Sequence, residues 1–445
     1  MAGRMMYSGR DMMAFSPIKT LAIQGVFKLA DWFGFWHDPV DLDIEGVNNY
    51  HMLVWFYTSG RPITRAEKGS GLEVFFAKQR QNGIPTLPAG FQKQSTITMS
   101  AVGDLMCNSA LEHSADIYYR GVADQIFDAD IAFANLESTL TSHEIPKPTL
   151  SLDALPKINA TSAQYDIVSG YQGRRYSIFQ LANNHILDHG MEGILTTRQR
   201  LDNDGIPHIG TNLSAEEQKR GVIVEKNGLR LGFVAATFGV NFMPFPEGKP
   251  YAVNQVRFHQ YHTEVDLSLL EQQIAWCREQ GCDLVIACLH WGVEWEFYPR
   301  AYQVNQAHQL AEAGADVIIG HHAHVIQPME WYQTRRDPDR WVPIFYNLGN
   351  LVPLVTAPFS ALSLVARLTL ARGQVNGIEK MLVENAHLTP VIQLHQEQDG
   401  KVRVWLDKLR ALVAHPASDE EQYYTAEAAI YADLVLGRDW RKEHR

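Results

Sequence analysis

The sequence feature that most constrains the fold is a helical pattern followed by a short apolar run, which occurs three times. In the clearest copy, residues 266–292, Gly281 separates the helical pattern from an uninterrupted apolar run at 284–289. The helical positions are Leu267, Leu270, Ile274 and Cys277. Further copies lie at 302–319 and 191–209. Strands that are buried on both faces and alternate with helices indicate an α/β fold, in which ligands gather at the carboxyl ends of the strands.

The pattern divides the 445 residues into three parts. Residues 1–95 carry many aromatic residues and no catalytic-type cluster, so we expect an N-terminal extension that could cap a site. Residues 96–415 form the main domain, and residues 416–445 form a helical tail. Further expected elements are a helix at 72–81, a strand at 96–102, antiparallel strands at 362–370, 377–383 and 402–405, and a helix at 420–436. The proline-containing segments 141–175 and 241–250 are predicted to be inserted loops.

Composition limits the partners and the cellular compartment. A formal net charge of −11 argues against a nucleic-acid partner, because binding to phosphates needs a basic face. The most apolar N-terminal window, residues 20–36, contains Gln24, Lys28 and Asp31, so we expect neither a spanning helix nor a signal peptide. We therefore expect a cytoplasmic protein. The sequence leaves its oligomeric state open.

Two other features have ordinary structural explanations. An aromatic stripe at helical spacing favours packing in the core, with an interfacial amphipathic helix as the alternative. The stripe consists of Ile23, Val26, Phe27, Leu29, Trp32 and Phe33. The cysteines match neither a disulfide framework nor a zinc ribbon, so reduced thiols are expected. They are Cys107, Cys277, Cys282 and Cys288.

Six short segments at predicted strand ends carry metal-ligand or acid/base side chains. They lie at 103–106, 135–137, 183–188, 290–294, 322–327 and 347–350. One such segment would carry little information. Six in this order indicate a two-metal hydrolytic centre, because carboxylate, amide oxygen and imidazole groups on loops after strands are the ligands that such a centre needs.

The candidate metal ligands come from four of these segments. His322 and His324, two residues apart on a turn, can reach two metals or two sides of one metal. Glu137 has two oxygens and can bridge two cations. Asp104 follows Gly103, which would let the backbone approach an ion closely. Each of these residues also has an ordinary explanation, since histidine pairs and single acids after strands are often solvated or part of a turn. The metal site is favoured because His290 is also present and because all these residues follow predicted strands.

The segment 183–188 suggests an acid/base pair next to a ligand. The amide oxygen of Asn184 could complete the shell of an ion. His185 would then point toward the substrate, and Asp188 could orient its imidazole, so that His185 donates a proton to a leaving group. The alternative is a turn that caps a helix beginning near Gly190.

Taken together, the segments resemble the CapA family of capsule and poly-γ-glutamate synthesis proteins, in the calcineurin-like metallophosphoesterase superfamily. The resemblance runs from Gly103 to about Val352. The matching motifs are Gly103-Asp104-x-Met106, Asn135-x-Glu137, Asn183-Asn184-His185-x-x-Asp188-x-Gly190, His290-Trp291-Gly292-x-Glu294, Gly320-His321-His322-Ala323-His324-Val325-Ile326-Gln327-Pro328 and Tyr346-Asn347-Leu348-Gly349-Asn350.

The resemblance implies a four-layer α-β-β-α sandwich with two divalent metals at the strand ends. It assigns Asp104 and His324 to one metal, with Glu137 as the bridge. The other metal takes Asn184, His290 and His322. His185 is the implied acid, supported by Asp188. Contact with the substrate or support of the ligands is implied for Asn135, Glu294, Gln327 and Asn350, whereas His321 is a spare histidine.

Three departures from the family pattern bear on the chemistry. Met106 stands where the wider superfamily has a ligating histidine, so one site should favour an oxygen-preferring ion. We expect two divalent ions, Mn²⁺ or Mg²⁺, with Zn²⁺, Fe²⁺ or Ca²⁺ as alternatives. The membrane anchor that is common in the family is not expected here, and about a hundred residues before Asp104 are extra.

Three functions remain in view. The first is a hydrolase that uses a metal-activated hydroxide on a small anionic or peptide-like substrate, either a phosphoester or a γ-glutamyl or other peptide amide. The second is a peptide Cα epimerase, because a metal pair that polarises a carbonyl also acidifies the adjacent C–H. The third is a non-catalytic, metal-stabilised scaffold of a polymer-handling assembly. An unligated, oriented histidine at position 185 argues against the third.

Overall fold

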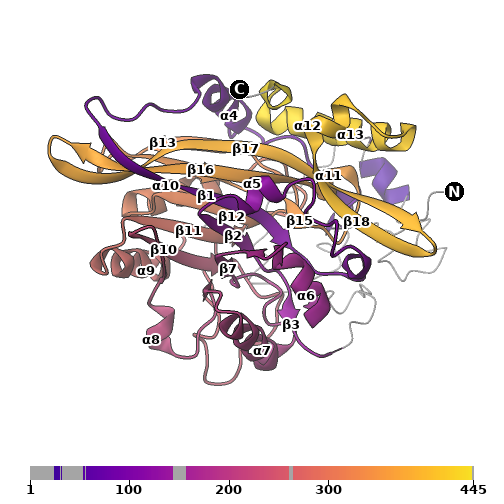
Figure 1. Cartoon of the computed structure of the whole chain (residues 1–445), viewed down its shortest axis with the longest axis horizontal. Helices are drawn as coiled ribbons and strands as arrows, with labels where there is room; N and C mark the ends of the chain where they lie inside the picture. Colours follow the sequence, from indigo (N-terminus) through magenta and orange to yellow (C-terminus); the bar gives the residue numbers. More distant parts are fainter. Residues whose placement is uncertain are drawn as a thin grey trace.

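The computed structural model describes residues 25–30, 32, 54–55, 57–143, 157–259 and 264–442. Most of their apolar side chains lie between and around two β-sheets, and the α/β prediction is confirmed (Figure 1). Within these ranges, no helix is both long enough and apolar enough to cross a bilayer. Of the N-terminal aromatic stripe, Phe27 is buried while Val26, Leu29 and Trp32 are exposed; Ile23 and Phe33 lie outside the described residues.

The first sheet has a parallel half and an antiparallel half. The parallel strands are β1 (Gln92–Leu105), β2 (Ile131–Asn135), β7 (Ile178–Gln180), β8 (His208–Ile209) and β15 (Asn350–Val352). The antiparallel strands are β16 (Leu362–Val375), β17 (Ile378–Gln398) and β18 (Lys401–Lys408). The predicted strands after Asn350 therefore do complete this sheet, as long antiparallel ribbons beside β1.

The second sheet contains the repeated strand and helix units. Four strands run parallel: β10 (Leu229–Thr237), β11 (Leu284–Trp291), β12 (Val317–His322) and β14 (Trp341–Phe345). The antiparallel edges are β9 (Val222–Lys226) and β13 (Met329–Gln333). Helices α9 (Ser268–Glu279) and α10 (Ala301–Ala313) contact β10, β11 and β12, as the sequence pattern predicts.

Side chains connect the two sheets. The rings of Phe133 on β2 and Phe233 on β10 stack with centroids 6.0 Å apart. His321 on β12 contacts the carbonyl oxygen of Val102 on β1 through Nε2, at 3.1 Å. This packing is consistent with the predicted sandwich and brings the ends of β1, β2, β11 and β12 to one region of the molecule.

The remaining elements surround these sheets. They are α4 (Leu72–Asn82), η1 (Ser109–His113), α5 (Ala123–Phe127), β3 (Thr139–Leu140), β4 (Asn159–Ala160), α6 (Ser162–Val168), β5 (Gly170–Tyr171), β6 (Arg174–Arg175), α7 (Gly190–Asn203), α8 (Ala215–Gln218), α11 (Pro358–Ala361), α12 (Leu409–Ala414), α13 (Asp419–Leu436) and η2 (Asp439–Arg441). The predicted helices at 72–81, 191–203 and 420–436 are confirmed as α4, α7 and α13. The tail helix α13 packs on α11 and α12 (Figure 1).

One loop prediction is wrong in part. The sequence predicts an inserted loop at 141–175, but β4, α6, β5 and β6 lie within the described part of that segment, and 144–156 fall outside it. The sequence carries the helix signal, because Thr161 and Gln164 form a capping box at the start of α6. The second predicted loop, 241–250, contains neither helix nor strand and is confirmed.

Gly103 lies where two segments of backbone approach each other closely. A Cβ atom there would lie 2.0 Å from the carbonyl oxygen of Gly349. Asp104 donates its backbone N–H to that same carbonyl, at 3.0 Å. The glycine therefore lets the chain just before β15 approach β1, and this approach sets Asp104 beside Asn350 in the sheet register.

Candidate metal centre

The carboxylate of Glu137 lies at the middle of the cluster formed by the strand ends. It follows β2 and is fully buried, and neither of its oxygens has a hydrogen-bond partner in the structure. Its Oε1 atom lies 3.6 Å from Nε2 of His290 and 3.9 Å from Nε2 of His324. Burial, followed by the carboxylates of Asp104 and Glu294, raises the pKa of Glu137 well above its usual range. A buried acid with no donor is costly unless a cation compensates it.

Two groups of ligand-type side chains meet at this carboxylate. Glu137, His322 and His324 form one group, and Asp104, Glu137 and His290 form the other. Within each group, one ligand atom per residue lies within 4.8 Å of the others, and all five residues are buried. The groups are not exclusive, because Nδ1 of His324 also lies 3.7 Å from Oδ2 of Asp104, the two residues that the resemblance assigns to one metal. The shared member is Glu137, as expected for a bridging carboxylate.

The histidines of the cluster are suited to metal binding. Burial, followed by the neighbouring imidazoles, lowers the pKa of both His290 and His322 well below the ordinary value. Both rings therefore stay neutral, and a neutral imidazole has a nitrogen lone pair that can bind a metal ion. Nδ1 of His322 is buried without a hydrogen-bond partner. His322 and His324 also have left-handed backbones, with φ of 95° and 55°, an uncommon conformation that is concentrated at functional sites.

Amide side chains hold several of these groups in place. Asn135 donates from Nδ2 to Oδ1 of Asp104 at 2.8 Å, and the same nitrogen lies 3.2 Å from Nδ1 of His290. Asn350 presents its Oδ1 to Nδ1 of His324 at 2.9 Å, which leaves Nε2 of that ring facing Glu137. Two of the residues that the resemblance marks as supporting or substrate-contacting thus lie directly behind candidate ligands.

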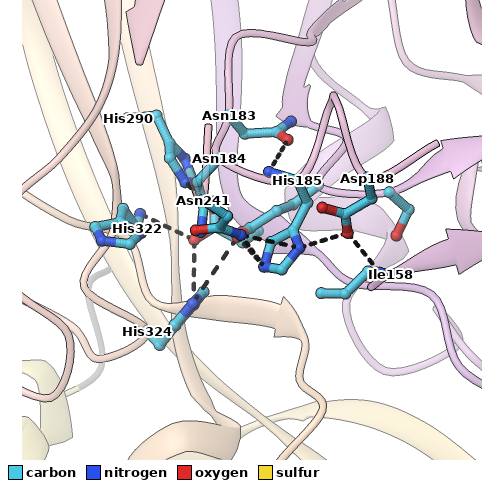
Figure 2. A network of polar contacts seen from close by, with 12 residues as sticks. Ile158, Asn183, Asn184, His185, Asp188, Asn241, His290, His322 and His324 are labelled. Atoms are coloured by element: carbon cyan, nitrogen blue, oxygen red, sulfur yellow. Dashed lines mark hydrogen bonds and ion pairs between the residues drawn. The ribbon is translucent and has the colours of Figure 1, made fainter. Parts of the chain in front are cut away.

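Asn184 and His185 belong to the same network of polar contacts as His290, His322 and His324 (Figure 2). Oδ1 of Asn184 lies 2.8 Å from Nε2 of His290. Nδ1 of His185 lies 2.7 Å from Oδ2 of Asp188, while its Nε2 is 4.0 Å from Oε1 of Glu137. The Asp188 carboxylate also accepts the backbone N–H of Ile158 at 2.6 Å, which fixes its orientation. His185 therefore faces the cluster with an ordered carboxylate behind it.

Three other residues named from the sequence lie further out. His321 turns away from the cluster toward Val102, as expected for a spare histidine. Gln327 donates from Nε2 to the carbonyl oxygen of Glu296 at 2.7 Å and so contacts the loop after β11. Glu294 accepts the indole N–H of Trp55, a residue of the N-terminal segment. The negative charge of Glu294 also contributes to the raised pKa of Glu137, so this carboxylate is near the cluster.

The sequence interpretation missed three residues that touch the cluster. Asn241 contacts both Asn184 and His185. Phe238 packs on His322 and His259, with ring centroids 4.3 Å and 4.5 Å away. His259 accepts the backbone N–H of Gly292 through Nε2, at 3.0 Å. In the sequence, the only indication that these residues belong to the site was their position in or beside the loop after a buried strand. Many loop residues share that position.

The aromatic residues after β11 pack in the interior. Trp291, Trp295, Phe297 and Tyr298 are all buried. Trp295 lies 5.5 Å from His324, ring centroid to ring centroid, so part of this aromatic layer supports a candidate ligand.

The residues fit a divalent metal pair by their chemistry. The cluster combines neutral imidazoles, two buried carboxylates and an amide oxygen, which is a donor set that Mn²⁺, Zn²⁺ and Fe²⁺ accept. The unpartnered Glu137 carboxylate is the specific observation behind this fit.

The sequence is similar to those of two CapA proteins from Bacillus species. The capsule biosynthesis protein CapA of Bacillus anthracis is 25% identical over 273 residues, which are 60% of this chain and 62% of the relative. The PGA biosynthesis protein CapA of Bacillus subtilis (strain 168) is 26% identical over 264 residues, 58% of this chain and 63% of the relative. The chain therefore spans about three fifths of the length of these relatives.

Two further similarities cover other shares of the chain. A probable polyglutamine synthesis accessory protein of Mycobacterium tuberculosis (strain ATCC 25618 / H37Rv) is 28% identical over 233 residues, 50% of this chain and 55% of the relative. A crystal structure of a hypothetical protein from Thermus thermophilus has a TM-score of 0.36 and 12% identity, and covers 66% of this chain and 99% of that one.

The family model described as bacterial capsule synthesis protein PGA_cap matches residues 98–353. This region is more than half of the chain and contains every residue of the candidate metal centre. The chain is similar to the CapA proteins and belongs to the PGA_cap family of bacterial capsule synthesis proteins.

Proposed function

We propose that this chain is a metal-dependent hydrolase that acts in capsule or poly-γ-glutamate metabolism. The observation that carries the proposal is the buried, unpartnered carboxylate of Glu137, which two groups of ligand-type side chains share. The ordered His185–Asp188 pair beside it supports a reaction over a purely structural site.

The proposed ligands are the two buried acids, the amide oxygen of Asn184 and three imidazoles. The residues are Asp104, Glu137, Asn184, His290, His322 and His324. Divalent ions held there would lower the pKa of a bound water toward neutrality and offset negative charge on the attacked group. Asn135 and Asn350 keep Asp104 and His324 in place, so the ligands are ordered before an ion arrives.

His185 is the proposed proton donor. Its Nδ1 is engaged by Asp188, so Nε2, which faces Glu137, is the nitrogen free to carry the transferred proton. In the proposed reaction, the oxygen of water bonds to phosphorus or to an acyl carbon as the P–O or C–N bond breaks. The proton on Nε2 passes to the departing oxygen or nitrogen, and the proton lost by water restores the ring.

The proposed substrate is a phosphoester or a γ-glutamyl or other peptide amide. The names of the similar proteins, which concern capsule and PGA biosynthesis, favour the amide. The centre is rich in acids, with Asp104, Glu137, Asp188 and Glu294 close together. Attraction of an anionic substrate would therefore depend on bound cations.

The N-terminal segment is proposed to cap the centre. Trp55 donates to Glu294, and its ring lies 6.5 Å from that of Trp295, centroid to centroid. Ile63 pairs with the same loop, since it donates to the carbonyl oxygen of Trp295 at 2.8 Å. Residues before the family match thereby join the loop that supports His324.

The test is an activity screen on metal-loaded protein with phosphodiesters and γ-glutamyl peptides, beside the His185→Gln and Glu137→Gln variants. The proposal expects product heavier by one water, a large loss in His185→Gln with its metals retained, and loss of metals in Glu137→Gln. Solvent deuterium uptake without mass gain of water would indicate epimerisation instead. A metal-loaded wild type with no turnover of any substrate would indicate a scaffold, and unchanged turnover in His185→Gln would remove His185 from the reaction.

A further inference from the structure

The loop residue Asn241 makes contacts that its place outside the strand-end motifs does not explain. Its Oδ1 accepts from Nδ2 of Asn184 at 3.0 Å. Its Nδ2 lies 3.4 Å from Nδ1 and 3.5 Å from Nε2 of His185. Figure 2 shows the Asn241 side chain between these two residues, in the centre of the network.

The bond to Asn184 fixes which way that amide points. Because the nitrogen of Asn184 is held by Asn241, its oxygen faces His290, 2.8 Å from Nε2 of that ring. An amide oxygen can bind a cation, whereas an amide nitrogen cannot. Asn241 thus selects the orientation in which Asn184 is a competent ligand.

The contact with His185 is of a different kind. The amide nitrogen is nearly equidistant from the two ring nitrogens, and Nδ1 is already engaged by Asp188 at 2.7 Å. The distances are long for a hydrogen bond. Asn241 therefore limits the movement of the ring and leaves its bond to Asp188 intact.

The backbone of the loop forms a tight turn at Asn241. Asn241 and Phe242 both have left-handed conformations, with φ of 52° and 59°. Met243 donates to the carbonyl oxygen of Val240 at 2.9 Å and closes the turn around them. Turns with two left-handed central residues favour asparagine followed by glycine, so Asn241 is the expected residue and the half-exposed Phe242 is not. The turn thus places Asn241 against the cluster although Phe242 is an unfavourable residue at its second central position.

We infer that Asn241 is a positioning residue of the metal centre, which orients Asn184 toward a cation and confines the ring of His185. This inference rests on the proposed metal site and adds a member to it from a loop that sequence motifs do not mark. The corresponding support of metal ligands in other proteins typically changes metal affinity by about 10- to 100-fold when it is lost.

The experiment measures Mn²⁺ binding by calorimetry, without substrate, in the wild type, Asn241→Gly and Asn241→Asp. Glycine removes the side chain and keeps the left-handed backbone. The matched control is Asn376→Gly, because Asn376 is also a left-handed asparagine, with φ of 52°, but it is exposed in the turn between β16 and β17.

The inference predicts that Asn241→Gly weakens one Mn²⁺ site by about tenfold or more. Asn241→Asp, which keeps an oxygen acceptor for Asn184, should bind at least as well as the wild type, and Asn376→Gly should match the wild type. Equal affinity in Asn241→Gly and the wild type would overturn this inference alone. A wild type that binds no Mn²⁺ would overturn both this inference and the proposed hydrolase.

Discussion

Nδ1 of His185 lies 2.7 Å from Oδ2 of Asp188, and both side chains are almost completely buried beside the metal-ligand cluster. The two residues are three positions apart in the sequence, so a single tight turn brings their side chains together. The other ring nitrogen of His185 faces Glu137 across 4.0 Å. This relationship supports the proposed reaction over a metal site that only stabilises the fold, because an oriented histidine that is not itself a proposed ligand has no use in a purely structural site.

The first prediction concerns this pair. Asp188→Asn keeps the shape of the side chain but removes the charge that orients the imidazole, so turnover should fall by about a hundredfold. Metal content, measured by elemental mass spectrometry, should stay at the wild-type value because Asp188 is not among the proposed ligands. Turnover equal to that of the wild type would remove His185 from the reaction.

The second prediction concerns the pH dependence of stability. Burial, followed by the charge of Arg300, lowers the pKa of His259 from 6.5 to about 3. A histidine with a lowered pKa in the folded state contributes its full stability above pH 6.5, and this contribution is lost as the pH falls toward 3. His259→Gln, which can still accept the N–H of Gly292, should therefore lose less stability on acidification.

The measurement is urea unfolding of chelator-treated protein at pH 6.5 and pH 4.5. The difference between the two pH values should be smaller in His259→Gln by about 2 kcal/mol. An identical pH dependence of the unfolding free energy in both proteins would show that the pKa of His259 is the same in the folded and unfolded states, which would contradict its burial as a neutral ring.

The third prediction tests the approach of the backbone at Gly103. An alanine Cβ would lie 2.0 Å from the carbonyl oxygen of Gly349, so strands β1 and β15 would have to separate. Gly103→Ala should destabilise the protein by about 3 kcal/mol or more. Gly60→Ala is the control, since nothing lies within 4 Å of a Cβ there. Similar melting temperatures for the two variants would contradict the close packing of these strands.

The fourth prediction addresses the N-terminal cap. Trp55→Phe keeps an aromatic ring, though a smaller one, and removes the N–H that Glu294 accepts, which leaves this carboxylate free to shift beside Glu137. The specificity constant kcat/KM should fall about tenfold, with little change in melting temperature. Trp341→Phe on β14, which is remote from the cluster, should leave kcat/KM unchanged. If both variants behave alike, residues 54–67 play no part in the site.

Much of the fold was predictable because its elements carry strong local signals. The runs that became β11 and β12 are apolar on both faces, and Gly281 and Gly314 end the helices that precede them. Helix α6 was missed because it has only three buried apolar residues among polar ones, and because the prolines before it suggested a loop. The capping box at Thr161 and Gln164 was the better signal.

The site was predictable where ligand-type residues directly follow strands, and not elsewhere. Asp104, Glu137 and His290 come together because parallel strands end at the same edge of their sheets. Asn241 reaches the cluster from a loop, and Trp55 reaches Glu294 from a helical residue of the N-terminal segment. No periodic pattern in the sequence predicts where such a segment folds back. The distances of His290 and His324 from Asp104 depend on how the two sheets pack, which strand patterns do not specify.

The most direct test of the account is the metal content of the purified protein and of its Glu137→Gln variant, by elemental mass spectrometry after reconstitution with Mn²⁺. Glu384→Gln is the matched control, because Glu384 only pairs with Lys93 on the surface. The account predicts about two divalent ions per chain in the wild type and the control, and loss of both in Glu137→Gln, since that carboxylate is shared. No bound metal in the wild type, or two ions retained in Glu137→Gln, would contradict it.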